Sequence, residues 1–258
     1  MVRQSLKAKE PTSEDAFRLR GLDNTRIEAL SDGVFALAIA MLIISTSIPS
    51  TFDELLLFLA DLVPFAVCVT LLMVIWYQHY IFFARYGLKD AKTVAINTIL
   101  LLLVLFYIYP LKFLFQILVK LFFYAFSGRG EEINQMFKQV IPFEKTSHLM
   151  VIYGIGAGMI FLVMAWLYIN AYRKRSTLDL SEIETFDTKN SIYTNLIMAG
   201  IPLLSALIAG LKFGGDSSFM ISGFTYFLYP VIFAVYGIRA DKQRKKLTQV
   251  GLHRASPG

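Results

Sequence analysis

The chain has 258 residues, of which 56% are hydrophobic and 17% are charged, and its mean hydropathy is +0.56. A soluble domain carries about 45–50% apolar and about 25% charged residues, so this composition excludes a water-soluble protein. The net charge of +6 is compatible with a nucleic-acid partner, but the charges lie between long apolar runs. This distribution indicates membrane topology and no nucleic-acid partner.

Six apolar runs follow one another along the chain, and each is long enough to cross the roughly 30 Å hydrocarbon layer, which takes about 20 helical residues. The first run begins at about Val34, too late for a secretory signal, so we expect a retained span. The runs lack the alternation of barrel strands, which favours helices because backbone groups in lipid must be paired internally. The predicted spans are Ile27–Ile48, Glu54–Phe83, Thr93–Phe115, His148–Asn170, Asn190–Leu211 and Phe219–Ile238.

Most of the 25 lysine and arginine residues lie in four segments: residues 1–26, the linkers after the second and fourth predicted spans, and the tail 239–258. By the positive-inside rule these segments are cytoplasmic. Both termini are then cytoplasmic, which requires an even number of spans. We therefore expect an all-α polytopic membrane protein with a single six-helix domain over residues 1–258.

The first predicted span opens with the stretch RIEALSDGVFALAI, residues 26–39. Arg26, Ser31 and Asp32 place a cation, a hydroxyl and a carboxylate at the mouth of a transmembrane helix. Leaving the Asp32 charge unpaired costs about 2.5–3.5 kcal/mol on insertion scales, so we expect it to have a partner in the bundle. An ordinary capping and anchoring cluster explains the same residues.

Further along the first span, Leu37, Met41 and Ile44 form one apolar stripe at the helical period. Such a stripe is, on its own, typical of a packing face.

The third predicted span contains Tyr109-Pro110, which predicts that the helix ends or kinks there because proline removes a backbone hydrogen bond. Beyond the proline, Lys112, Gln116 and Lys120 recur on one helical face. We interpret this face as an interfacial helix or outer extension rather than a ligand site. In the fourth span, Gly154 and Gly158 fit the small-residue pattern of helix packing in membranes.

The sequence offers little for an enzyme. It has three histidines and no His-Glu-x-x-His metal motif, and it has neither a Gly-x-Ser-x-Gly elbow nor a phosphate-binding glycine loop. Span interiors are almost free of carboxylates, which disfavours a secondary transporter. A Thr-Val-Gly-Tyr-Gly filter is also absent, which excludes a pore-loop potassium channel.

The stretch at residues 26–39 resembles the pattern R-x-x-x-F-S-D-G-V-F-A-I-A-I-T of the endosomal and lysosomal potassium channels, transmembrane protein 175, in their prokaryotic branch. Trp76-Tyr-Gln-His79 resembles the Trp-x-x-His element in the second helix of that family. The resemblance implies a homotetramer in the prokaryotic plasma membrane, with four first helices around the pore. It also implies that potassium and other monovalent cations permeate, and that no cofactor is bound.

The resemblance assigns roles to particular residues. Leu37, Met41 and Ile44 would point into the pore, with Leu37 at its narrowest point. Ala40 stands where the family has a threonine associated with potassium preference, so weak discrimination against sodium is expected. A structural polar network would hold the first helix to its neighbours; its members are Arg26, Ser31, Asp32, Trp76, His79 and Asn97.

Two other functions remain open from the sequence. One is an ion-coupled or proton-coupled carrier that shares the fold, and the other is a structural membrane subunit with no transport of its own. Passive flux down a gradient favours the channel, and strict coupling to a second solute favours the carrier.

Overall fold

The computed structural model describes residues 17–21, 23, 25–44, 49–140, 142 and 145–255, and all regular structure within these ranges is helical. The all-α prediction is therefore confirmed. The α-helices are α2 (Arg26–Ile44), α3 (Phe52–Ala60), α4 (Leu62–Tyr86), α5 (Ala91–Phe126), α6 (Gly130–Gln139), α7 (Thr146–Arg173), α8 (Glu182–Gly210), α9 (Ser218–Phe224) and α10 (Leu228–Ala255). Short 3-10 turns flank α9, at Gly215–Ser217 and Thr225–Phe227.

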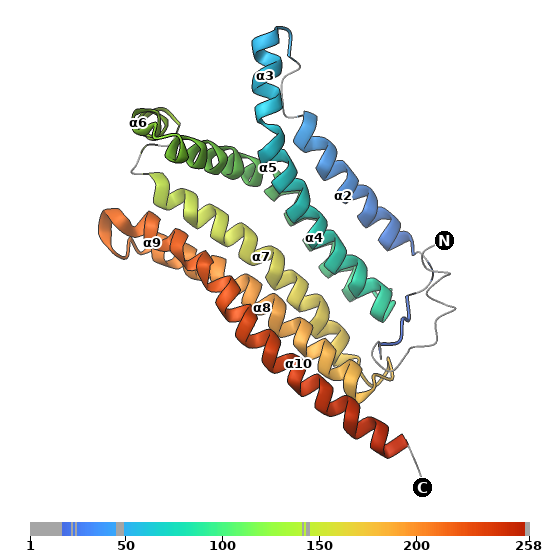
Figure 1. Cartoon of the computed structure of the whole chain (residues 1–258). Helices are drawn as coiled ribbons and strands as arrows, with labels where there is room; N and C mark the ends of the chain where they lie inside the picture. Colours follow the sequence, from blue (N-terminus) through green and yellow to red (C-terminus); the bar gives the residue numbers. More distant parts are fainter. Residues whose placement is uncertain are drawn as a thin grey trace.

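The long helices lie side by side, with α2 at one edge of the array and α10 at the other (Figure 1). α2 packs against α4 and α5, α5 packs against α7, and α7 packs most extensively against α8, which in turn contacts α9 and α10. The main hydrophobic core lies where α2, α4, α5 and α7 meet, around Phe35, Phe82, Leu100 and Met164. Among the described helices, none packs against the remaining face of α2.

Five helical stretches in the described residues are long and apolar enough to cross a membrane: Phe52–Tyr86, Ala91–Phe126, Thr146–Arg173, Glu182–Gly210 and Ser218–Gln249. They overlap the second to sixth predicted spans. The first predicted span corresponds to α2, a helix of 19 residues that ends at Ile44. Its predicted continuation, residues 45–48, lies outside the described residues, so the count of six spans stays a prediction.

The third span is longer than predicted. α5 runs unbroken from Ala91 to Phe126 with Pro110 inside it, so the proline does not end the helix. Proline removes a single hydrogen bond from the ladder, and the surrounding bonds have no water to replace them in lipid, so the helix continues.

The glycine motif of α7 packs against α8, as predicted. A Cβ on Gly154 would lie 2.3 Å from the carbonyl oxygen of Pro202, and a Cβ on Gly158 would lie 2.6 Å from Leu203. Only glycine allows this approach. Pro202 itself lacks the N–H that would bond to the Met198 carbonyl one turn back, and the Tyr229 hydroxyl of α10 donates to that carbonyl at 2.8 Å. A proline in α8 thus creates a binding point for α10.

Candidate functional site

The start of α2 is fixed by a reciprocal cap. The Glu28 backbone N–H donates to Thr25 Oγ1 at 3.2 Å, and the Thr25 N–H donates to Glu28 Oε2 at 3.0 Å. This is the Thr-x-x-Glu capping box, which satisfies two donors that a helix start leaves without intrahelical partners. Glu28 is buried. The motif is visible in the sequence, and the sequence analysis missed it.

One turn further along, α2 is joined to α4 and α5 by a chain of buried polar groups. Ser31 Oγ donates to the Ile27 carbonyl at 2.8 Å and accepts from Asn97 Nδ2 at 2.9 Å. Asn97 Oδ1 lies 2.8 Å from His79 Nε2. Because Asn97 gives its amide hydrogen to Ser31, its oxygen is the acceptor, and His79 donates through Nε2. All three side chains are buried, with at most 3% of their surface exposed.

A second contact joins the same helices. Trp76 Nε1 donates to Asp32 Oδ1 at 2.8 Å, which gives this carboxylate the partner that the sequence analysis expected. The structure therefore brings together Ser31 with Asn97 and His79, and Asp32 with Trp76. Arg26 is exposed on the first turn of α2, and within the described residues no hydrogen bond or ion pair joins it to these groups.

The face of α2 opposite these contacts carries the predicted pore residues. Phe35, Ala38 and Leu42 are fully buried against the rest of the chain. Leu37, by contrast, is 51% exposed, and Ala40 and Met41 are half-buried. Ile44 ends the helix, and its side chain lies outside the described residues. The described part of the chain thus holds one side of α2 and leaves Leu37 on the other, exposed side.

The far end of α2 has polar contacts of its own. Lys112 Nζ donates to the Leu42 carbonyl at 2.8 Å, and Gln116 Nε2 donates to Asp61 Oδ2 at 2.9 Å. Lys112 is only 6% exposed. α5 continues through Pro110 and carries Lys112 to the end of α2, so Lys112 belongs to the same helix as Asn97; the interpretation of this face as an interfacial or outer extension stays a prediction.

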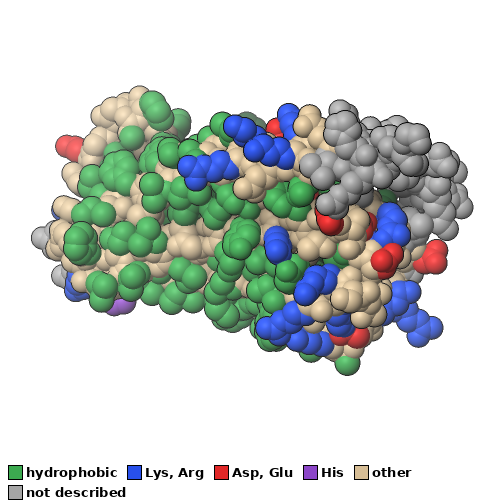
Figure 2. Space-filling view, turned by 90° about the horizontal axis from the view of Figure 1, so that it is seen from below, with side chains coloured by type: hydrophobic (Ala, Val, Ile, Leu, Met, Phe, Trp, Pro, Cys, Tyr) green, Lys and Arg blue, Asp and Glu red, His purple; other side chains and the backbone are tan. Residues whose placement is uncertain are grey.

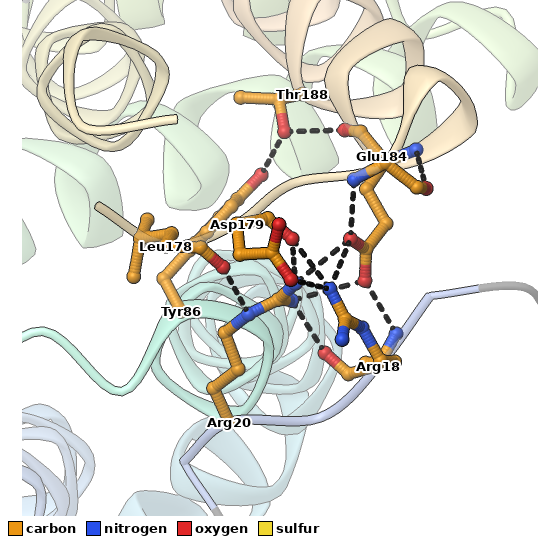
Figure 3. A network of polar contacts seen from close by, with 8 residues as sticks. Arg18, Arg20, Tyr86, Leu178, Asp179, Glu184 and Thr188 are labelled. Atoms are coloured by element: carbon orange, nitrogen blue, oxygen red, sulfur yellow. Dashed lines mark hydrogen bonds and ion pairs between the residues drawn. The ribbon is translucent and has the colours of Figure 1, made fainter. Parts of the chain in front are cut away.

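Residues 17–21 cross the other end of the bundle and converge on Glu184, an arrangement that we call the N-terminal clamp (Figure 3). Glu184 is completely buried, and it accepts from the Arg18 backbone N–H at 2.7 Å and from Arg20 Nη2 at 2.8 Å. It also accepts from the Ser181 N–H in a capping box that starts α8. Arg18 and Arg20 additionally bond to Asp179, and Arg20 Nε donates to the Leu178 carbonyl at 2.9 Å.

Two glycines bring the clamp against the end of α4. The Gly21 N–H donates to the Ala84 carbonyl at 3.0 Å, and a Cβ on Gly21 would lie 2.0 Å from the Phe83 carbonyl oxygen. Gly87 ends α4 with a φ of +57°, and a Cβ there would lie 2.9 Å from the Arg20 carbonyl oxygen. The segment that leads into α2 is therefore held backbone against backbone.

A neighbouring ion pair joins α5 to α7 at the same end. Lys174 Nζ pairs with the carboxylate of Asp90, the N-cap of α5, and Asn170 Nδ2 donates to Thr93 Oγ1 at 3.0 Å. Partial burial alone would raise the pKa of Asp90, but the hydrogen bonds from Lys174 and Thr93 outweigh it and lower this pKa to about 2.

Basic side chains gather at this end of the molecule, whereas the other end of the visible face is mostly hydrophobic (Figure 2). The clamp brings Arg18 and Arg20 to the start of α8. Arg244 of α10 pairs with Asp187 of α8 at 3.0 Å. The N-terminal segment, the α7–α8 connection and the C-terminal half of α10 therefore lie on one side of the bundle.

Comparisons with known proteins point to one family. Residues 26–107 match the sequence model described as "Endosomal/lysosomal potassium channel TMEM175". These residues include every predicted site residue. A curated protein from Marivirga tractuosa named "Potassium channel" is 46% identical over 239 residues, covering 90% of this chain and 94% of that protein.

Two solved structures are similar. A threonine-to-alanine variant of the potassium channel MtTMEM175, in complex with a nanobody–MBP fusion protein, is 45% identical with a TM-score of 0.77, over 88% of this chain and 97% of that one. A lysosomal potassium-selective channel TMEM175 homolog from Chamaesiphon minutus shares the fold, with 22% identity and a TM-score of 0.51, over 83% of this chain and 96% of that one. On the identity and coverage of the first relatives, this chain is a multi-pass membrane protein of the TMEM175 potassium channel family.

Proposed function

We propose that this chain forms a homotetrameric, potassium-permeable cation channel without a pore-loop filter, in which four copies of α2 surround the pore. The observation that carries the proposal is the two-sided environment of α2, since one face is bonded to α4 and α5 and the other presents Leu37 uncovered. The similarity to a protein named as a potassium channel supports the same function.

In this channel the constriction is formed by Leu37, Met41 and Ile44. A ring of large apolar side chains closes a pore because water and hydrated ions are unfavourable there. Leu37 is the narrowest point. The contacts of Ser31, Asp32, Trp76, His79 and Asn97 hold the helix so that this side chain faces the axis. Arg26, which is exposed, lies on the first turn of α2, within reach of a neighbouring subunit in this arrangement.

We further propose six spans, with α2 as the first, and both termini in the cytoplasm of a prokaryotic cell. The length of α2, about 28 Å at 1.5 Å per residue, supports a spanning role. The basic clusters at the clamp end support the orientation, because lysine and arginine favour the cytoplasmic side.

Cysteine crosslinking tests the arrangement. Leu37→Cys in a Cys68→Ala background is expected to give crosslinked dimers of the chain with a short bismaleimide, since four copies meet at the axis. Val235→Cys on α10 is the matched control, because Val235 is 48% exposed but lies on the helix at the opposite edge. Crosslinks from Val235→Cys and none from Leu37→Cys would contradict the tetramer around α2.

A flux assay tests the activity. Proteoliposomes loaded with potassium are expected to release it passively down its gradient, and the measurement is repeated with sodium. If the flux requires a second solute or a proton gradient, the protein is a coupled carrier and not a channel. If correctly assembled protein shows no ion flux, the remaining function is that of a structural membrane subunit.

The ion preference is expected to depend on Ala40. Potassium and sodium differ in how well pore groups replace their hydration shells, and an alanine ring offers no oxygen. Ala40→Thr would add four hydroxyls, so we expect the potassium-to-sodium permeability ratio to rise by up to about tenfold, which corresponds to about 1.4 kcal/mol. The measurement is the reversal potential under bi-ionic conditions. An unchanged potential in Ala40→Thr would place selectivity elsewhere.

A further inference from the structure

Helix α5 touches α2 with polar side chains at two separate places. Asn97 donates to Ser31 Oγ near the start of α2, and Lys112 donates to the Leu42 carbonyl near its end. Asn97 and Lys112 are about 22 Å apart along α5 at 1.5 Å per residue. Leu37 lies between the two contact points on α2. Contacts at two well-separated points restrict both the tilt and the rotation of one helix against another.

The second contact is made by a buried lysine. Leu42 lies two residues before Ile44, the last residue of α2. A lysine inside a membrane helix costs about 2.5–3.5 kcal/mol on insertion scales, so its amino group is expected to have a polar partner. Leu42 is fully buried, and the Lys112 amino group reaches its oxygen from the neighbouring helix.

The surroundings of Lys112 join this contact to a third element. Asp61 lies at the junction of α3 and α4 and accepts from Gln116, one turn beyond Lys112 on α5. Lys112 and Asp61 line the same groove at the end of α2, together with Ile43, Leu62 and Phe65. The end of α2 is thus held where α5 meets the α3–α4 junction.

We propose that Lys112 is a positioning residue that fixes the outer end of the pore helix, where "outer" means the end away from the N-terminal clamp. The proposal rests on the proposed role of α2 in the pore. α5 then holds α2 at both ends, and Leu37 is placed by two anchors rather than by the inner contacts alone. An opening motion that turns α2 has to break the contact with Lys112 or move α5 with it.

The test measures how accessible Leu37 is in the assembled channel. In the Cys68→Ala background, Leu37→Cys is modified with methyl methanethiosulfonate, a neutral reagent whose rate does not respond to the charge of Lys112. Lys112→Met is expected to raise the modification rate about tenfold, equivalent to about 1.4 kcal/mol, because the outer half of α2 is no longer held. Lys112→Arg keeps a donor and is expected to stay within about twofold of the parent, by the same conversion less than 0.5 kcal/mol.

The matched control is Lys120→Met, which makes the same change on the same helix at an exposed position. A rate in Lys112→Met that equals that of Lys120→Met would overturn the proposal. If Lys112→Met does not assemble, Lys112→Gln is measured instead. Its modification rate is expected to lie between that of the parent and the tenfold higher rate expected for Lys112→Met. Failure of both to assemble would also overturn it and make Lys112 an assembly residue. Absence of the Leu37→Cys crosslink in the protein that keeps Lys112 is a separate result, and it contradicts the proposed pore lined by α2.

Discussion

Leu37→Ser is expected to raise the basal conductance of the channel by more than about tenfold. In the proposed tetramer the change replaces four apolar side chains at the narrowest point by four hydroxyls. A hydroxyl ring lets water remain in the constriction, so a hydrated ion meets a lower barrier. Lowering that barrier by about 1.4 kcal/mol gives a factor of ten, and transferring even one leucine side chain from water is worth about 1.5–3 kcal/mol.

The measurement is the flux rate per assembled channel in proteoliposomes, together with single-channel recording. Leu207→Ser is the matched control, because Leu207 is 57% exposed on α8, away from α2. We expect this control to conduct like the parent. If assembled Leu37→Ser conducts like the parent, the constriction lies at Met41 or Ile44. Unchanged conductance after serine substitution at all three positions would contradict a pore lined by α2.

Glu184→Ala is expected to lower the free energy of unfolding by about 3–5 kcal/mol, the usual cost of removing one partner of a buried ion pair. Arg20, whose side chain is only 17% exposed, would lose its counter-charge. The backbone N–H groups of Arg18 and Ser181 would lose their acceptor at the same time. The clamp would then release the segment that leads into α2.

Thermal unfolding in detergent, followed by size-exclusion chromatography, measures this loss. Glu182→Ala is the control, because Glu182 carries the same charge in the same first turn of α8 but is exposed. Glu184→Gln keeps the shape and a weaker acceptor, so an intermediate loss is expected. Equal losses in Glu184→Ala and Glu182→Ala would show that the buried contacts of Glu184 add no stability.

The sequence located the membrane helices well because apolar runs of about 20 residues leave few alternatives in lipid. Helix ends were predicted less well. α8 begins at Glu182 rather than Asn190, because the Ser181–Glu184 capping box starts the helix among polar residues before the apolar run. α5 continues to Phe126 because Pro110 removes only one bond from its ladder. Hydropathy marks the apolar part of each helix, and α5 and α8 extend beyond their apolar parts into polar residues or past a proline.

The candidate site was predicted through family resemblance rather than through spacing. Ser31, His79 and Asn97 come from three helices, and no periodicity along the chain relates them. The Thr25–Glu28 cap was readable from the local pattern. The roles of Lys112 and Glu184 were not, since each depends on a partner at least 70 residues away in the sequence. The sequence pattern suggested only an interfacial or outer position for Lys112, and Glu184 was not singled out.

The N-terminal clamp has a consequence for how the protein is made. Arg20 and Glu184 are separated by 164 positions, so the ribosome needs roughly 8 to 33 seconds after Arg20 before Glu184 exists, at about 5–20 residues per second. During that interval α2 is already in the chain, and the segment before it can contact the end of α4 but not Glu184. The α2 contacts to α4 and α5 can form first, and the clamp closes only after α8 has been inserted. α2 is therefore among the last of the described helices to be fully secured, and in the proposed tetramer the assembly of four chains has to wait until α8 is in place.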